Sequence, residues 1–229
     1  MSFDLAAWKE SYKAAVSGAF GERIVCAGLQ GSRARNEAQP DSDIDAVLIL
    51  DRLTANDLSL CRKLFQALPG GMQVCGFVSG KSELACWDAA ELVSFYFDTQ
   101  PLIGDLAFIR PLITRQAAVR AVHTGACSIY HACCHNAVFG NDASSLHVLC
   151  KAAFFVLRVK YYVETGEFIQ RGADLMPLLP EENRKILQVY IASVSGKTDQ
   201  MDLLHHTNLL LVWSGNLITE FHVQLFGKS

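Results

Sequence analysis

The first half of the chain contains both short apolar runs and longer amphipathic segments. Three apolar runs, each bounded by polar or glycine-rich residues, predict β-strands at residues 23–29, 43–50 and 72–78. Apolar residues spaced three and four apart predict helices at residues 3–16, 56–68 and 87–97. The polar segment 31–42 joins the first two strands and is predicted to be a loop. Thr54 is a candidate N-cap for the second helix.

The pattern changes after about residue 110, where strand signals nearly vanish. Long helical patterns follow at residues 113–138, 143–165, 180–194 and 199–226. The change predicts two domains, an α/β head at residues 1–110 and a helical C-terminal domain at residues 111–229. The expected fold class is therefore α+β, with a small mixed-sheet head followed by an all-helical bundle.

Composition narrows the class of protein. Of the 229 residues, 51% are hydrophobic and only 19% are charged, which is typical of a compact globular chain. A net charge of −3 gives no overall attraction to nucleic acid, so a polynucleotide partner is not expected. No apolar run approaches the length of a membrane span, and residues 1–4 do not resemble a signal peptide. We therefore expect a cytoplasmic protein whose eight cysteines remain thiols. The sequence leaves the oligomeric state open.

The chemistry-bearing residues gather where the first predicted strand ends and the second begins. On a strand, Asp43 and Asp45 project to the same face while Ile44 enters the core. Two adjacent carboxylates repel each other unless a cation lies between them, and hard oxygen ligands suit Mg²⁺. Gly31 permits close approach of a phosphate to the backbone, and the hydroxyl of Ser32 can donate to it. Together these residues predict a site for a metal-chelated nucleoside triphosphate. The alternative interpretation is a polar hairpin loop with a solvated pair of acids.

Gly31-Ser32, a spacer of about ten residues and Asp43-Ile44-Asp45 together resemble the signature of the DNA polymerase β-like nucleotidyltransferases. The variant found here is similar to the small bacterial branch that holds the aminoglycoside and minimal nucleotidyltransferases. The segment 151–158, followed by Thr165-Gly166, resembles the helical domain that accompanies this branch.

The resemblance implies a Mg²⁺-dependent enzyme that moves AMP from ATP to a hydroxyl of a small-molecule acceptor, by analogy an aminoglycoside. It implies Asp43 and Asp45 as catalytic metal ligands, and Gly31, Ser32 and Arg33 as nucleotide-binding residues. A guanidinium such as that of Arg33 grips phosphate with two parallel hydrogen bonds, so we expect it to reach the leaving pyrophosphate.

The helical domain is expected to bind the acceptor. Its candidates are polar-tipped side chains, namely Tyr130, His131, Tyr161, Tyr162, Glu164 and Glu167. Lys151 and Arg158 are expected either to contact phosphates or to solvate a helix face.

The chain departs from the family's pattern in one respect. Such enzymes usually place a third carboxylate on the neighbouring strand, but the predicted strand 72–78 carries Gln73 and Cys75 on the corresponding face and no acid. Glu83 and Asp98 are the candidates for a third acid. Two further hypotheses stay open: a protein adenylyltransferase of antitoxin type, and a nucleotide sensor without catalytic activity, which the missing third acid favours.

Overall fold

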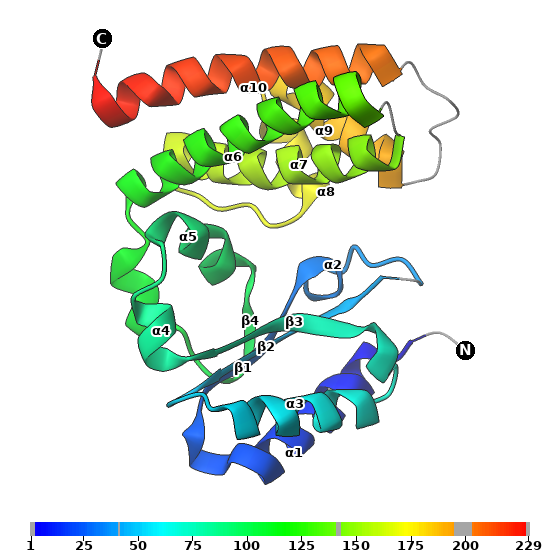
Figure 1. Ribbon diagram of the computed structural model, residues 1–229, viewed down its shortest axis with the longest axis vertical. Helices are drawn as coiled ribbons and strands as arrows, with labels where there is room; N and C mark the ends of the chain where they lie inside the picture. Colours follow the sequence, from blue (N-terminus) through cyan, green and yellow to red (C-terminus); the bar gives the residue numbers. More distant parts are fainter. Residues whose placement is uncertain (1–2, 41, 141–142, 195–202, 228–229) are drawn as a thin grey trace. The chain divides into compact units, whose positions relative to one another are not determined.

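The computed structural model describes residues 3–40, 42–140, 143–194 and 203–227 (Figure 1). The chain forms two compact units. The first comprises Met1–Asp88 with Phe95–Leu112, and the second comprises Ala89–Ser94 with Ile113–Ser229. Helix α5 (Ala89–Asp98) is therefore divided between the two units.

The first unit is built on a four-stranded mixed sheet. Its strands are β1 (Ile24–Gln30), β2 (Ile44–Leu50), β3 (Val74–Gly80) and β4 (Gln100–Gly104), in the order β3-β2-β1-β4. β1 is antiparallel to both β2 and β4, whereas β2 and β3 are parallel. The three predicted strands are confirmed with shifts of one or two residues. β4 was missed because Pro101 suggested a break, but a proline is tolerated on an edge strand such as this one.

Helices α1 (Leu5–Phe20) and α3 (Ala55–Ala67) cover one face of the sheet (Figure 1). Alternate residues of β2 face these helices and are fully buried, namely Ile44, Ala46, Leu48 and Leu50. From α1, the buried Tyr12 hydroxyl donates to the carbonyl oxygen of Val47 at 2.7 Å. Thr54 caps α3 as predicted, in a reciprocal capping box with Asp57. One face of β2 thus packs in the core under α1 and α3, and the strand residues between those four point to the other face of the sheet.

Short helical segments connect these elements. They are η1 (Gly21–Arg23), α2 (Gly31–Ala34), η2 (Gly71–Gln73), α4 (Lys81–Ala85) and η3 (Ala107–Leu112). α2 lies at the start of the segment that was predicted to be a loop.

All the described elements of the second unit are helical, as predicted. Its elements are α6 (Arg115–His135), a π-helical turn (Asn136–Gly140), α7 (Ala143–Thr165), α8 (Gly172–Leu175), η5 (Met176–Leu178), α9 (Glu181–Val194) and α10 (Leu203–Phe226). α6 packs against both α7 and α10, and α7 also packs against α9. The start of the predicted helix 199–226 lies outside the described residues.

An arginine lies in the core of the helical unit. Arg158 is fully buried, and its guanidinium lies 4.7 to 5.3 Å from the ring centres of Phe154, Phe155 and Phe168. It also donates to the carbonyl oxygen of Gln170 at 3.3 Å. Both expectations for Arg158 were wrong, because the side chain neither solvates a helix face nor is accessible to a phosphate. Its flat cation instead packs on aromatic rings.

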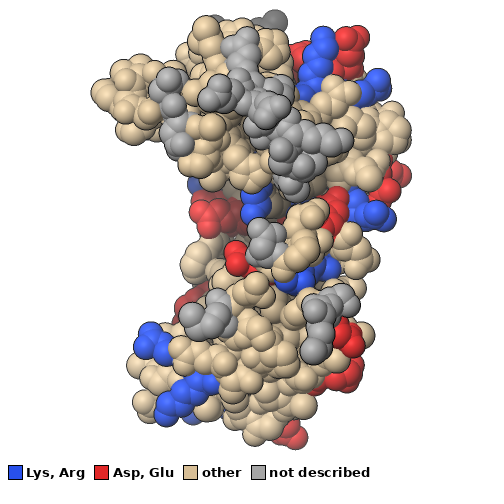
Figure 2. Space-filling model, turned by 90° about the vertical axis from the view of Figure 1, so that its right-hand side faces the viewer, with Lys and Arg blue, Asp and Glu red and all other residues tan. Residues whose placement is uncertain are grey.

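The surface charge is mixed. On the face shown in Figure 2, acidic and basic side chains are interspersed among uncharged ones. In the described part of the chain, no helix has both the length and the apolarity needed to cross a membrane.

Candidate nucleotide-binding site

The proposed site lies where β1 ends and β2 begins. β1 ends at Gln30, and the next residue, Gly31, has a φ of +72° and opens α2. In the antiparallel ladder Gln30 pairs with Asp45 of β2. The tight turn at Gly31 is thus held beside the first residues of β2 by the sheet itself.

Gly31 lies directly against the carboxylate of Asp45. A Cβ atom added to Gly31 would overlap Oδ2 of Asp45 and lie 2.7 Å from its Cγ. Because L-residues with side chains rarely adopt this positive φ, two separate reasons require glycine here. The structure therefore brings together the turn and one of the two predicted carboxylates.

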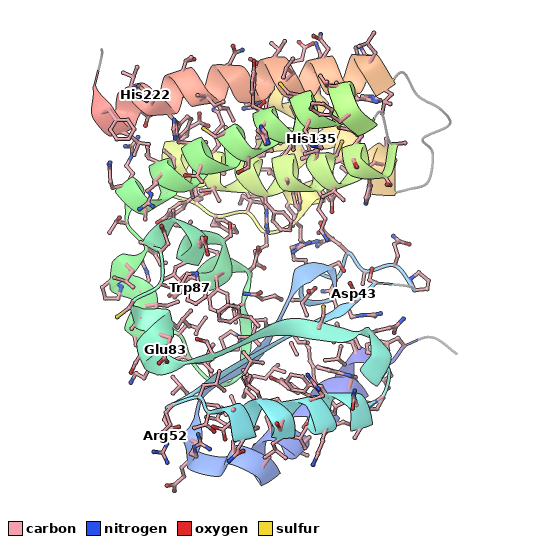
Figure 3. All side chains as sticks on the ribbon, in the orientation of Figure 1. Asp43, Arg52, Glu83, Trp87, His135 and His222 are labelled. Carbon is pink, nitrogen blue, oxygen red and sulfur yellow. The ribbon has the colours of Figure 1, made fainter. Side chains whose placement is uncertain are left out.

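The second carboxylate precedes β2. Asp43 is exposed and Asp45 is partly exposed, whereas Ile44 between them is fully buried. This alternation follows from the pleat, with Ile44 packed in the core beneath α1 and α3. Both acids are therefore available to solvent at one end of β2, and Figure 3 shows Asp43 at that end.

Arg33 has contacts that differ from those expected. Its guanidinium is buried and donates to the carbonyl oxygens of Ser42 (Nη2, 2.6 Å) and Asp43 (Nε, 3.1 Å). It also lies 4.1 Å from the ring centre of Phe3. These contacts fix the backbone that leads into β2, so Arg33 positions Asp43 through its main chain.

Ser32 is partly exposed on α2, next to Gly31. Its carbonyl oxygen accepts a hydrogen bond from the backbone N–H of Glu37 at 2.8 Å. That bond folds the following segment back on α2 and fixes the backbone of the turn.

The structure separates the two candidates for a third acid. Glu83 lies on α4, with its carboxylate against Gly80 at the end of β3. Gly80 pairs with Leu50, five residues along β2 from Asp45, a span of about 16 Å. Glu83 is thus at the opposite end of the sheet from Asp43, as Figure 3 shows. As a third ligand it is excluded by this geometry.

Asp98 is the last residue of α5. Its neighbour Thr99 accepts a hydrogen bond from the side chain of Gln30 at 2.7 Å, which ties this segment to the end of β1. The side chain of Asp98, however, is only 8% exposed. The structure therefore ties its neighbour to the end of β1 but leaves Asp98 itself buried.

The residue that faces Asp45 on the neighbouring strand is Cys75. The two residues are paired in the parallel ladder of β2 and β3, and the Cys75 thiol donates to Oδ1 of Asp45 at 3.4 Å. The sequence showed Cys75 on a strand face without an acid, but it could not predict this contact. Gln73 lies in η2, before β3 begins.

The acceptor candidates of the helical unit lie on α6, α7 and the segment after α7. Tyr130, His131, Glu164 and Glu167 are exposed, and Tyr161 and Tyr162 are partly buried. Glu164 is paired with Lys160 one turn earlier on α7. These candidates therefore lie at or near the surface of the helical unit, and the described residues do not show them grouped into one site.

The fold consists of a mixed-sheet head followed by a helical domain. A solved structure with this fold is spectinomycin adenyltransferase AAD(9) from Enterococcus faecialis, crystallised with ATP and spectinomycin. The match has a TM-score of 0.57 and 13% sequence identity, and it covers 94% of this chain and 100% of that one. No protein-family model matches the chain, and neither does any curated protein sequence. The predicted α+β fold is confirmed by this likeness.

Proposed function

We propose that the protein is a divalent-metal-dependent nucleotidyltransferase that transfers AMP from ATP to a hydroxyl of a small-molecule acceptor. The observation that carries this proposal is the approach of Gly31 to the Asp45 carboxylate across β1 and β2. A fold shared with an adenyltransferase crystallised with ATP and spectinomycin supports the same reaction class.

The two carboxylates by themselves fit a hard divalent cation, and Mg²⁺ is the ion that the sequence predicts. Asp43 and Asp45 would supply carboxylate oxygens, which are the ligands such ions prefer. A cation held there neutralises the charge that builds on the phosphate oxygens during attack at the α-phosphorus. No described group of three or more His, Cys, Asp and Glu side chains could hold a metal by itself. Phosphate oxygens or water would therefore complete the coordination.

The chain's own residues would orient the triphosphate. Gly31 leaves the backbone open to close approach, and the hydroxyl of Ser32 would donate to a phosphate oxygen. Arg33 holds the carbonyl oxygens of Ser42 and Asp43, and so fixes the strand that carries the acids. The rigid sheet thereby presents the carboxylates and the turn in one arrangement.

The first prediction tests the carboxylates. Asp43→Asn and Asp45→Asn should each abolish metal-dependent ATP binding, because a neutral amide cannot balance the charge of a divalent cation. Titration calorimetry with Mg-ATP measures binding, and thermal melting should show that both variants remain folded. Glu83→Gln and Glu22→Gln are matched controls, since both remove an exposed carboxylate at the far end of the sheet. Undiminished binding in both asparagine variants would refute the site.

Transfer itself is tested with ATP labelled at the α-phosphate. The label should move to a member of a panel of hydroxylated small molecules that includes spectinomycin. Transfer to a protein in a lysate instead would support the alternative of a protein adenylyltransferase.

One observation favours a second candidate function, a nucleotide sensor without catalytic activity. The family's pattern usually has a third carboxylate on the strand beside the two acids, but none of the β3 residues Val74–Gly80 is an acid, and the residue that pairs with Asp45 is Cys75. A protein that binds Mg-ATP through Asp43 and Asp45 but transfers no label to any acceptor would be such a sensor.

A further inference from the structure

The contact between Cys75 and Asp45 joins two metal-ligating groups at one end of the sheet. Val74 and Val78 pack against the core under α1 and α3, so Cys75 projects from the opposite face of β3. Asp45 projects from the same face of β2, since its neighbours Ile44 and Ala46 are in that core. Cys75 is exposed, and its sulfur can therefore be reached by a solute.

The Asp45 carboxylate lies between two different neighbours. Oδ2 is the atom that a side chain on Gly31 would overlap, whereas Oδ1 accepts the Cys75 hydrogen bond. One oxygen thus faces the turn proposed to hold phosphates, and the other faces the thiol. A cation bound at Oδ1 would have the sulfur of Cys75 within reach as an additional protein ligand.

The observed separation fits shared coordination. With metal–sulfur and metal–oxygen bonds of about 2.3 and 2.1 Å, two ligands of a tetrahedral ion lie about 3.6 Å apart. Sγ of Cys75 and Oδ1 of Asp45 are 3.4 Å apart. The two atoms can therefore bind one ion with little movement of either side chain.

The sulfur changes which ion the site prefers. Mg²⁺ binds hard oxygen ligands, whereas Zn²⁺ and Cd²⁺ accept thiolate sulfur readily. We propose that Cys75 is a metal ligand beside Asp45, and that it makes the site select a thiolate-accepting divalent cation over Mg²⁺. On binding, the S–H bond breaks, the proton passes to solvent and the sulfur electron pair coordinates the ion. The proposal rests on the proposed function for its link to nucleotide, but the cation selectivity can be measured alone.

The test uses the full-length protein and Cd²⁺, without nucleotide. A thiolate bound to Cd²⁺ absorbs in the ultraviolet by charge transfer, so the titration reports coordination by sulfur directly. Wild type and Cys86→Ser should give the same saturable band, since Cys86 is another exposed thiol, which follows α4 and lies beyond the far end of β3. Cys75→Ser should lose that band. Asp45→Asn should weaken the Cd²⁺ affinity at least about tenfold. Mutation of a residue that only hydrogen-bonds to a metal ligand already lowers metal affinity by roughly that factor.

A second variant tests selectivity. Cys75→Asp replaces the sulfur with a carboxylate oxygen, so the ratio of Cd²⁺ to Mg²⁺ affinity should fall about tenfold or more. Thermal melting should show that both Cys75 variants fold, as expected for an exposed side chain. A band that persists in Cys75→Ser, or no band in wild type, overturns the proposal. So does an unchanged affinity ratio in Cys75→Asp.

The result of the Cd²⁺ titration can be distinguished from the result of the Mg-ATP binding test of the proposed function. Cysteine-dependent Cd²⁺ binding without any ATP binding would leave this inference standing and remove the nucleotidyltransferase proposal. Carboxylate-dependent Mg-ATP binding without a charge-transfer band would support the nucleotidyltransferase proposal and refute Cys75 as a metal ligand.

Discussion

Gly31 combines two constraints at a single position. Its φ of +72° disfavours any residue with a side chain, and the space that a Cβ would fill is taken by the Asp45 carboxylate. Backbone strain and carboxylate displacement are separate penalties. The first acts on folding, and the second acts on whatever the carboxylate binds.

These penalties can be separated by two alanine substitutions. Gly21 also has a positive φ, +52°, but a Cβ there would meet nothing within 4 Å. Gly21→Ala and Gly31→Ala should each lower the free energy of unfolding by about 1 to 3 kcal/mol. Only Gly31→Ala should also weaken metal–ATP binding, by about tenfold or more, because it pushes Asp45 aside. Urea denaturation and calorimetry measure the two effects. Equal ATP affinity in the two variants would show that Gly31 matters only for folding.

At the residue scale, the sequence predicts the features of the site that depend on local spacing, such as the face of a strand to which a side chain points. Asp43, Ile44 and Asp45 alternate along one strand, so their faces follow from the pleat alone. The neighbours of Asp45 depend instead on how β3 registers with β2, which the sequence does not specify. For this reason the Cys75 contact was missed and Glu83 was kept as a candidate. The main-chain contacts of Arg33 could not be foreseen, because its spacing does not reveal that its guanidinium is buried against carbonyl oxygens.

At the scale of elements, an ion-pair network holds α3 to the sheet at the end away from the site. Arg23 donates to Asp57, the acid of the α3 capping box, at 2.8 Å, and to Asp51 at 3.1 Å. The Arg23 hydrogen bonds, followed by that of Thr54, hold the pKa of Asp57 well below its usual value. The pKa of Asp51 is also lowered, chiefly by the backbone N–H of Arg52 and then by Arg23. Both acids are charged in the folded state at neutral pH.

This network predicts a pH dependence with a definite sign. The folded-state pKa of Asp57 is lowered, so its stabilising contribution is complete above the unfolded value of about 4. It is lost as the pH falls from there through the lower folded-state pKa. Asp57→Asn should therefore be less stable than wild type at neutral pH, and the difference should shrink below about pH 4. Urea midpoints across that range measure it. A difference that is constant with pH would contradict the assignment.

Most of the helices and strands could be predicted from hydrophobic periodicity. Every long helix and the three apolar strands were predicted, because burial of one face imposes the 3.6- or two-residue period. β4 was missed because its five residues are partly exposed at a sheet edge and begin Gln100-Pro101. α2 and α4 were missed because elements of four or five residues carry too little periodicity to be recognised.

At the scale of the whole molecule, the chain crosses between its two units more than once. Ala89–Ser94 belong to the second unit, and Phe95–Leu112 return to the first. Chain order alone would assign the whole of α5 to the first unit, since long-range packing leaves no mark on local periodicity. The cysteines are spread over both units, and their burial differs sharply between positions.

That distribution predicts which thiols react in the native protein. Burial raises the pKa of Cys26 and of Cys150 to about 12, and that of Cys133 to about 11, so few thiolates form there near neutral pH. Cys75 and Cys86 are exposed. Iodoacetamide labelling followed by peptide mass spectrometry should therefore modify Cys75 and Cys86 first.

The same experiment can report on the site. If ATP and a divalent cation occupy the turn beside Asp45, they should slow the labelling of Cys75, which lies 3.4 Å from that carboxylate. Cys86 serves as the internal control, because it follows α4 beyond the far end of β3 and should react at an unchanged rate. Rapid labelling of Cys26 or Cys150 would contradict the buried core. Equal protection of Cys75 and Cys86 would indicate a general change in the head, and no protection of either would place the nucleotide away from Asp45.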